Sequence, residues 1–385
     1  MEAFNFYTPT RIIGGQGAVR ERASLFEGFG SHAFIVTGAG SAKASGALDD
    51  VLYALGQCGI SCDIYDKIGP NPLALICAQG GEAARQCGAS FIIGIGGGSA
   101  LDAARAVSVY AANDFASPDE IFKGEFTQAL PLVTVGTTAG TGSEVDAASI
   151  LTSDVNGQKQ SIRKDFLFAK LAFCDYRYTK SMSLRQTVST GLDALCHCLE
   201  SWFHKGSSET SRTFSRRGAQ LLYPRLEEIA SGKYDLDDDG LRADLYHGSL
   251  WGGFSLTGAG AGFPHPAGYP LTEMGIFPHG VACAVFEKEF VQFSMKHCDP
   301  LWREQLLDVV GTEEKLYNTL DVLTHNNLTL SSSICDGIAH RFLDTKNARS
   351  ALGTITEAEA LRIVRELFLS CGQTTDCNGG WEYGR

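Results

Sequence analysis

The sequence predicts two domains, an α/β domain built on a parallel sheet and an all-helical domain after it. Its length of 385 residues suits two domains, at about 150 residues for each. In the first half, strand-like apolar runs alternate with helical segments, and after about Tyr178 few strand patterns remain. We therefore place the α/β domain at residues 1–178 and the helical domain at residues 179–385.

Alternating strands and helices in the first half predict βαβ units. Four short apolar runs are expected to be strands, namely 34–37, 62–65, 90–95 and 132–135. Segments with helical spacing follow the first three of them, at 46–55, 75–87 and 100–110. This order is typical of a parallel sheet with helices packed against it.

Long helices dominate the second half of the chain. Helical spacing covers seven segments, namely 184–204, 211–229, 241–254, 300–310, 316–323, 331–343 and 356–369. We expect the glycine-containing tail, residues 371–385, to be extended.

Composition excludes several function classes. Lys and Arg number 32 against 44 Asp and Glu, so the net charge of −12 disfavours nucleic acid and gives little support for an anionic membrane. No apolar run approaches the ~20 residues of a membrane span, and the start does not resemble a signal peptide. The 12 cysteines form no CxxC pair, which favours free buried thiols and a cytoplasmic protein.

Two polar, glycine-containing segments follow predicted strands. The first is Gly94–Ser99, which opens a helix, and the second is Thr137–Glu144. Glycines let a backbone approach a ligand, and a helix N-terminus offers unpaired N–H groups to phosphate. The alternatives are a tight turn and a loop that caps a helix. Two such loops at the carboxyl edge of one sheet favour a bound dinucleotide.

Four residues of the helical half form a candidate metal site. Asp193 and His197 are four apart on one face of a predicted helix, although this spacing also occurs in ordinary helix pairs. His265 and His279 lie in an apolar stretch rich in glycine and proline, which we expect to be a loop. They could also be core histidines bonded to backbone. Three imidazoles and a carboxylate suit Fe²⁺, Zn²⁺ or Ni²⁺, and the lack of thiolates argues against a structural zinc site.

Taken together in their order, the motifs resemble the iron-containing (group III) alcohol dehydrogenase family over nearly the whole chain. The similar segments are Phe4–Gly17, the GGGSxxD loop at 96–102, TTAGTGSE at 137–144, GxDALxH at 191–197 and PHG at 278–280. The resemblance implies a Rossmann-like dinucleotide-binding domain and a helical metal-binding domain, the fold shared with dehydroquinate synthase.

The resemblance also implies a set of binding residues. It makes Asp193, His197, His265 and His279 the ligands of a divalent metal, with Fe²⁺ favoured and Zn²⁺ or Ni²⁺ possible. It places NAD(P) against Asn71, Gly97, Gly98, Ser99, Asp102, Thr137, Thr138 and Lys159.

Two positions depart from the family pattern. Many members carry Asp after the first strand, where it binds the adenine ribose, and Gly38 stands there in this chain. Without a carboxylate to repel a 2′-phosphate, we expect NADP(H) to be accepted. Many relatives have His where this chain has Tyr269. We therefore take Tyr269 as the candidate catalytic residue, a hydrogen-bond donor whose pKa of about 10 makes it a poor base.

The implied reaction is hydride transfer between NAD(P)(H) and a small primary alcohol or aldehyde, with the metal as Lewis acid. Relatives are commonly homodimers or larger. One alternative is an NAD- and metal-dependent lyase of the dehydroquinate-synthase type, which Arg163 and Lys164 keep open as phosphate-binding bases. The other is a non-catalytic protein that binds metal or nucleotide.

Overall fold

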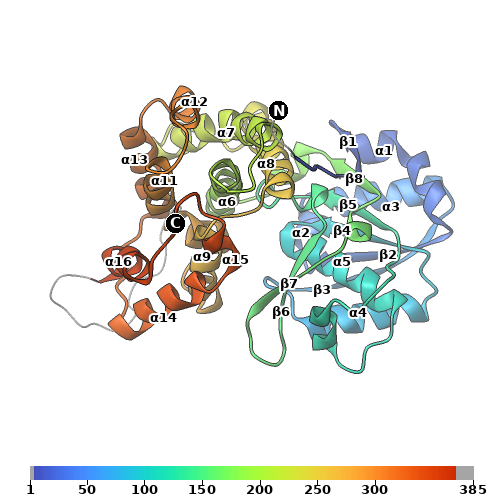
Figure 1. Ribbon diagram of the computed structural model, residues 1–385. Helices are drawn as coiled ribbons and strands as arrows, with labels where there is room; N and C mark the ends of the chain where they lie inside the picture. Colours follow the sequence, from blue (N-terminus) through green and yellow to red (C-terminus); the bar gives the residue numbers. More distant parts are fainter. Residues whose placement is uncertain (1–3, 370–385) are drawn as a thin grey trace. The chain divides into compact units, whose positions relative to one another are not determined.

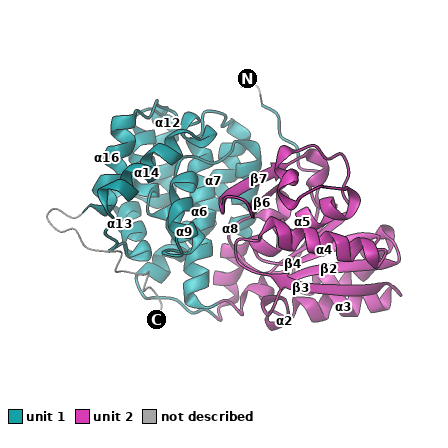
Figure 2. Ribbon diagram, turned by 90° about the horizontal axis from the view of Figure 1, so that it is seen from below, with its two compact units in different colours: residues 1–7, 183–236, 247–385 teal, residues 8–182, 237–246 magenta. Residues whose placement is uncertain are grey.

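The computed structural model describes residues 4–369, so the tail expected to be extended lies outside the described residues. The chain divides into two compact units (Figure 2). The α/β unit contains residues 8–182 and 237–246. The helical unit contains the start of the chain up to Tyr7, residues 183–236 and the chain from His247 onward. No helix among the described residues is long and apolar enough to cross a membrane.

A six-stranded sheet forms the centre of the α/β unit (Figure 1). All neighbouring strands are parallel, in the order β1-β8-β5-β4-β2-β3. The strands are β1 (Arg11–Gly14), β2 (His32–Gly38), β3 (Ser61–Ile68), β4 (Phe91–Gly96), β5 (Leu132–Gly136) and β8 (Leu171–Cys174). The predicted parallel sheet is therefore confirmed.

Helices cover both faces of this sheet, because its buried strands are apolar on both sides. On β2, Phe34 and Val36 face one hydrophobic cluster, while Ala33 and Ile35 face the other. The first cluster packs under α4 (Ala74–Gln86) and α5 (Gly98–Ala112). The second packs under α1 (Ala18–Glu21), α2 (Ser41–Ala44) and α3 (Ala47–Gln57). Both faces of a parallel sheet are normally buried in this way.

The strand order creates a switch point between β2 and β4. From β2 the chain moves outward to β3, and it then crosses back to β4 and continues to β5 on the other side. In open α/β sheets, ligands bind at the carboxyl ends of strands beside such a point. Gly38 is the last residue of β2, and the two predicted binding loops follow β4 and β5.

The helical unit contains the long helices that the spacing predicted. They are α6 (Leu184–Trp202), α7 (Glu209–Ala230), the part of α8 (Asp239–Gly258) from His247 onward, α12 (Pro300–Val310), α13 (Glu313–Thr324), α14 (Ser332–Leu343) and α16 (Glu357–Phe368). Four shorter helices complete it, namely α9 (Pro264–Glu273), α10 (His279–Ala284), α11 (Glu287–Met295) and α15 (Lys346–Arg349).

The expectation that His265 and His279 lie in a loop was wrong, because these histidines lie in α9 and α10. Pro264 stands at the first position of α9, where its missing N–H costs no hydrogen bond. Gly268 lies so close to α10 that a Cβ there would meet the Ala282 backbone at 2.7 Å. Pro264 and Gly268 therefore serve here as a helix-start residue and a helix-packing residue.

Two short segments depart from the single boundary expected near residue 178. Residues up to Tyr7 group with the helical unit, where the Phe6 ring lies 5.1 Å from the Phe214 ring. Residues 237–246 group with the α/β unit, where the Tyr246 hydroxyl donates a hydrogen bond to Glu144. Also unforeseen was the antiparallel hairpin of β6 (Ala148–Thr152) and β7 (Lys159–Arg163).

Candidate metal and cofactor sites

Helix α6 carries two of the predicted metal ligands. A capping box starts the helix, in which Ser183 and Gln186 each bond the backbone of the other. About two and three turns beyond Gln186, Asp193 and His197 lie on the same face, and both side chains are almost wholly buried. Their closest Asp193 Oδ1 and His197 Nε2 atoms are 3.9 Å apart.

Helices α9 and α10 bring the other two histidines to Asp193. A Cβ on Gly280 would lie 1.9 Å from the Ser189 carbonyl oxygen and 2.8 Å from the Asp193 Cβ, so only glycine lets α10 pack this closely on α6. This approach places His279 Nε2 3.6 Å from Asp193 Oδ1. From α9, His265 Nε2 lies 3.5 Å from the same oxygen.

The spacing of these atoms fits a bound cation. Donors 2.0–2.3 Å from one ion at tetrahedral angles lie roughly 3.3–3.8 Å apart. The two shorter Asp193–histidine distances fall in this range, and His197 Nε2 lies closer, 3.0 Å from His265 Nε2. Within the described residues, buried Asp193 Oδ1 has no hydrogen-bond partner. A buried carboxylate oxygen that no hydrogen-bond donor reaches is unfavourable unless another group compensates its charge. A divalent cation bound between this oxygen and the surrounding imidazole nitrogens would do so.

The carboxylates and imidazoles of this cluster shift one another's pKa toward the charged forms. Although burial opposes ionisation, His197, His279 and His265 together hold the pKa of Asp193 below its usual range. Burial also disfavours the charged form of His265, but the carboxylates of Glu200 and Asp193 raise its pKa to about 10. A metal bound at His265 would have to displace a proton, so its binding would weaken as the pH falls.

Sequence reasoning missed Glu200, which lies one turn beyond His197 on α6. Its fully buried carboxylate accepts a hydrogen bond from His265 Nδ1 at 2.5 Å and another from the Gly262 N–H at 2.6 Å. The bond to Nδ1 leaves His265 Nε2 as the acceptor that faces Asp193. A carboxylate seven residues after Asp193, on the same helix face, was the signal that could have found it.

Sequence reasoning also missed Cys283. Asp193, His265, His279 and Cys283 offer ligand atoms that all lie within 4.8 Å of one another. The available signal was the spacing of His279 and Cys283, four apart on α10 as Asp193 and His197 are on α6. Tyr269 is near too, with its ring centroid 5.8 Å from that of His279, the most exposed of the three histidines.

In the α/β unit, six of the predicted cofactor residues lie at the carboxyl ends of β2, β4 and β5, namely Gly38, Gly97, Gly98, Ser99, Thr137 and Thr138. Gly38 is the last residue of β2, and Gly97 caps α5 directly after β4. A Cβ on Gly97 would lie 2.8 Å from the Thr138 side chain, so the two loops pack against each other. The Thr137 N–H also donates to the Gly96 carbonyl at 2.9 Å. The amides of Gly98 and Ser99 lie in the first turn of α5, where helices leave N–H groups unpaired.

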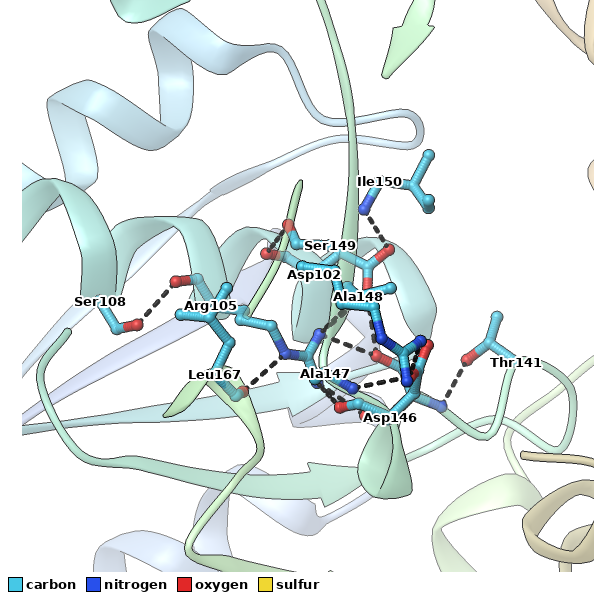
Figure 3. Close-up of polar contacts among 12 residues, drawn as sticks. Asp102, Arg105, Ser108, Thr141, Asp146, Ala147, Ala148, Ser149, Ile150 and Leu167 are labelled. Atoms are coloured by element: carbon cyan, nitrogen blue, oxygen red, sulfur yellow. Dashed lines mark hydrogen bonds and ion pairs between the residues drawn. The ribbon is translucent and has the colours of Figure 1, made fainter. Parts of the chain in front are cut away.

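Asp102 is held within a buried network (Figure 3). Its carboxylate accepts hydrogen bonds from the Ser143 hydroxyl at 2.8 Å and the Ile150 N–H at 3.0 Å, and it pairs with Arg105. Arg105 is wholly buried and also binds carbonyl oxygens of Ser143, Asp146, Ala148 and Leu167. Burial raises the pKa of Asp102 to about 6, with Arg105 opposing the shift. These contacts tie α5 to the end of the threonine-rich loop.

Asn71 and Lys159 approach the same strand residue. The Thr152 hydroxyl donates to the Asn71 carbonyl at 3.2 Å, and Lys159 pairs with Thr152 across the β6–β7 hairpin. Asn71 has a positive φ of 52°, a left-handed conformation that asparagine tolerates better than most residues. The hairpin thus brings together two predicted cofactor residues that are 88 positions apart in sequence (159 − 71).

Comparison with known proteins agrees with this architecture. The sequence model of the iron-containing alcohol dehydrogenase family matches residues 9–176. The sequence model of the C-terminal region of Fe-containing alcohol dehydrogenases matches residues 187–341. The chain belongs to the iron-containing alcohol dehydrogenase family. It is 31% identical to the sulfoacetaldehyde reductase of Bilophila wadsworthia, over 75% of each chain. It is 30% identical to alcohol dehydrogenase 4 of Saccharomyces cerevisiae (strain YJM789), over 73% of each.

Solved structures of iron-containing alcohol dehydrogenases share the whole fold. The structure of one from Thermotoga maritima superposes with a TM-score of 0.86 at 30% identity, over 95% of this chain and 99% of that one. Another iron-containing alcohol dehydrogenase gives a TM-score of 0.87, also at 30% identity and with the same coverage. The family, its fold and its oxidoreductase class are therefore those that the motifs indicated.

Proposed function

We propose that the chain is a metal-dependent alcohol dehydrogenase that transfers a hydride between NAD(P)(H) and a small primary alcohol or aldehyde. Asp193, His197, His265 and His279 would hold the divalent ion, with Fe²⁺ favoured by the family. The observation that carries the proposal is the buried Asp193 oxygen, which has no hydrogen-bond donor among the described residues and is surrounded by three imidazoles.

A divalent ion at this cluster supplies Lewis acidity toward the oxygen of an alcohol or carbonyl group. The protein's residues provide the rest. Three neutral imidazoles and one carboxylate leave a net charge of +1, which favours an anionic oxygen. Glu200 keeps His265 Nε2 directed at the site. Tyr269, beside the partly exposed His279, would donate its hydroxyl proton to the substrate oxygen or to water.

The α/β unit would bind the dinucleotide at the carboxyl edge of its sheet. Gly97, Gly98 and Ser99 offer backbone amides to phosphate, while Thr137 and Thr138 offer hydroxyl groups. Asn71 and Lys159, which both contact Thr152, would add further contacts to the dinucleotide. Asp102 would act on the threonine-rich loop through Ser143. At the end of β2, Gly38 presents no carboxylate, so NADPH should be accepted as well as NADH.

The named relatives support reduction or oxidation of small substrates. They include a sulfoacetaldehyde reductase and an alcohol dehydrogenase. The lyase alternative depended on Arg163 and Lys164 as free bases. Arg163 instead pairs with Asp146 at 2.8 Å, which weakens that alternative.

We also propose that the protein is cytoplasmic and forms a homodimer or a larger homo-oligomer. Light scattering of the purified protein tests the number of subunits.

The deciding experiment follows NAD(P)H oxidation at 340 nm with a panel of small aldehydes, using protein purified anaerobically and loaded with Fe²⁺. We expect turnover with at least one aldehyde and with both nicotinamide cofactors. Absence of turnover across the panel would refute the dehydrogenase proposal. A kcat/KM ratio for NADPH over NADH far below one would refute only the part that depends on Gly38.

A further inference from the structure

A second cluster of metal-binding side chains lies at the amino edge of the parallel sheet. His32 is the first residue of β2, Asp63 is the third residue of the edge strand β3, and Cys87 caps the end of α4. Their ligand atoms all lie within 4.8 Å of one another. Gly38 and the two predicted binding loops lie at the carboxyl ends of the strands, so this cluster occupies the opposite edge of the sheet.

The pleat of the strands places all three side chains on one face of the sheet. Phe34 on β2 and Tyr65 on β3 belong to the hydrophobic cluster that packs under α4 and α5. Residues two positions apart on a strand face the same side, so His32 and Asp63 face this side as well. Cys87 packs against the same hydrophobic cluster.

A serine beside His32 fixes which ring nitrogen carries the proton. The Ser61 hydroxyl donates its single hydrogen to the Ser31 carbonyl at 3.1 Å, so it accepts from His32 Nδ1, which lies 2.6 Å away. The lone pair is then on Nε2, which faces Asp63 Oδ2 at 2.8 Å. Two acceptors this close are favourable only with a proton or a metal ion between them.

The surroundings of Cys87 also favour a cation. Burial and the neighbouring Asp63 carboxylate raise the pKa of the Cys87 thiol, so the sulfur keeps its proton until a cation compensates the negative charge. Cys87 follows the last turn of α4 (Ala74–Gln86), and the C-terminal end of a helix carries a partial negative charge.

The separations suit one small ion after little movement. A tetrahedral zinc ion would hold His32 Nε2 and the Asp63 oxygen roughly 3.3 Å apart, about 0.5 Å farther than they lie now. The Asp63 side chain is 56% exposed, so it can move by this amount. A sulfur on the same ion would lie roughly 3.5 Å from both atoms, which is consistent with the 4.8 Å limit on the observed distances.

We propose that His32 Nε2, the Asp63 carboxylate and the Cys87 thiolate bind one Zn²⁺, with water as the fourth ligand. Zinc sites with three protein ligands commonly keep water in the fourth position. On binding, the Cys87 S–H bond breaks, a zinc–sulfur bond forms and the proton passes to solvent. Because a thiolate favours zinc over iron, this site and the proposed iron site select different metals. The zinc would tie the edge strand to β2 and to the end of α4.

The test is an anaerobic titration of the full chain with Co²⁺, because a cobalt–thiolate bond gives a charge-transfer band in the near ultraviolet. Cobalt bound to Asp193 and the three histidines of the proposed iron site has no thiolate ligand and gives no such band. We expect the band in wild type, and we expect Zn²⁺ to remove it by displacing the cobalt. Zinc-edge X-ray absorption should then show a sulfur neighbour at about 2.3 Å.

Variants assign the band to this cluster. Cys87→Ala should abolish it and leave aldehyde reduction unchanged, and Cys87→Ser repeats the test if the alanine variant fails to fold. His32→Gln and Asp63→Asn should weaken cobalt binding by roughly tenfold or more, at least the usual effect of losing a partner behind a ligand. The matched control is Cys62→Ala, which should keep the band. Cys62 is also partly buried on β3, but it packs against the hydrophobic cluster on the other face of the sheet.

Three outcomes would overturn the proposal. The first is the absence of the band in wild type, and the second is a band that is unchanged in Cys87→Ala. The third is wild-type affinity for cobalt in His32→Gln, which would show that the imidazole is not a ligand. None of these results bears on the proposed function, which aldehyde turnover tests separately.

Discussion

Replacing Glu200 by glutamine tests how the protein prepares His265 for a metal. In the structure, one Glu200 oxygen accepts from His265 Nδ1 and the other accepts from the Gly262 N–H. Glutamine has one oxygen and one NH₂ group, so it can satisfy only one of these two donors. If its oxygen turns to Gly262, its NH₂ group faces Nδ1 and favours the tautomer with the proton on Nε2, which cannot bind a metal.

The expected cost follows from this choice. Leaving a buried donor without an acceptor costs about 1–3 kcal/mol, and reversing the tautomer penalises the metal-bound state by a similar amount. This corresponds to a loss of roughly ten- to a hundredfold in metal affinity, the usual effect of removing a carboxylate behind a ligating histidine. The effect should be seen in binding itself as well as in kcat.

The assay is anaerobic chelator competition with Zn²⁺ and Fe²⁺, compared with Glu287→Gln as the control. Glu287 is wholly buried nearby, and neither of its carboxylate oxygens has a hydrogen-bond partner among the described residues. Burial and the neighbouring Glu200 raise its pKa well above the usual range, so glutamine mimics its neutral form. We expect Glu287→Gln to bind metal within about threefold of wild type. Affinity of Glu200→Gln within that same limit would refute the reasoning.

Four further predictions concern other parts of the chain. Gly280→Ala places a methyl group 1.9 Å from a carbonyl oxygen of α6, so the affinity for metal should fall at least tenfold. The control Gly337→Ala has open space around the new methyl group and should keep the wild-type affinity. Equal affinities of the two variants would contradict this prediction. The pKa of Asp102 in the folded state is about 6, above its usual 3.8, so the folded protein binds the proton more tightly than the unfolded chain does. The free energy of unfolding of wild type should therefore fall relative to that of Asp102→Asn as the pH rises from about 4 to 6. Urea unfolding at several pH values measures this difference, and a difference that stays constant would contradict the prediction. Gly38→Asp should shift the ratio of kcat/KM from NADPH toward NADH, and an unchanged ratio would count against the Gly38 argument. Tyr269→Phe should alter the pH dependence of kcat with little change in the KM for NADPH, and an unchanged pH profile would remove Tyr269 from proton transfer.

Local patterns predicted much of the fold. Helix α12 has the bounds that its spacing indicated, and α6 differs only by ending two residues earlier, at Trp202. Such helices show a clear apolar periodicity along a single segment. The hairpin of β6 and β7 was missed because its strands, Ala148–Thr152 and Lys159–Arg163, are short and partly exposed. Their stability depends on pairing with each other and on contacts with Asp102, which no local pattern shows.

The site was predictable where its chemistry follows a helical period. Asp193 and His197 are four apart, so one helix face brings them together without further information. His265 and His279 were predicted as ligands, but their helices were not, since the prolines and glycines of this stretch usually indicate loops. Glu200 and Cys283 were missed because their importance depends on packing between α6, α9 and α10. The close approach at Gly280 brings α10, and with it Cys283, to Asp193, whereas Glu200 contacts His265 of α9.

The central claim is that one divalent ion per chain, held by this cluster, enables reduction of an aldehyde. The most direct measurement strips the metal with a chelator, returns Fe²⁺ anaerobically in steps, and records the initial rate of NADPH oxidation at 340 nm together with metal content. We predict that the rate rises in proportion to bound iron and levels off at one equivalent, and that Asp193→Asn gains no activity. Full activity in the stripped protein, or a rate unrelated to bound iron, would contradict the account.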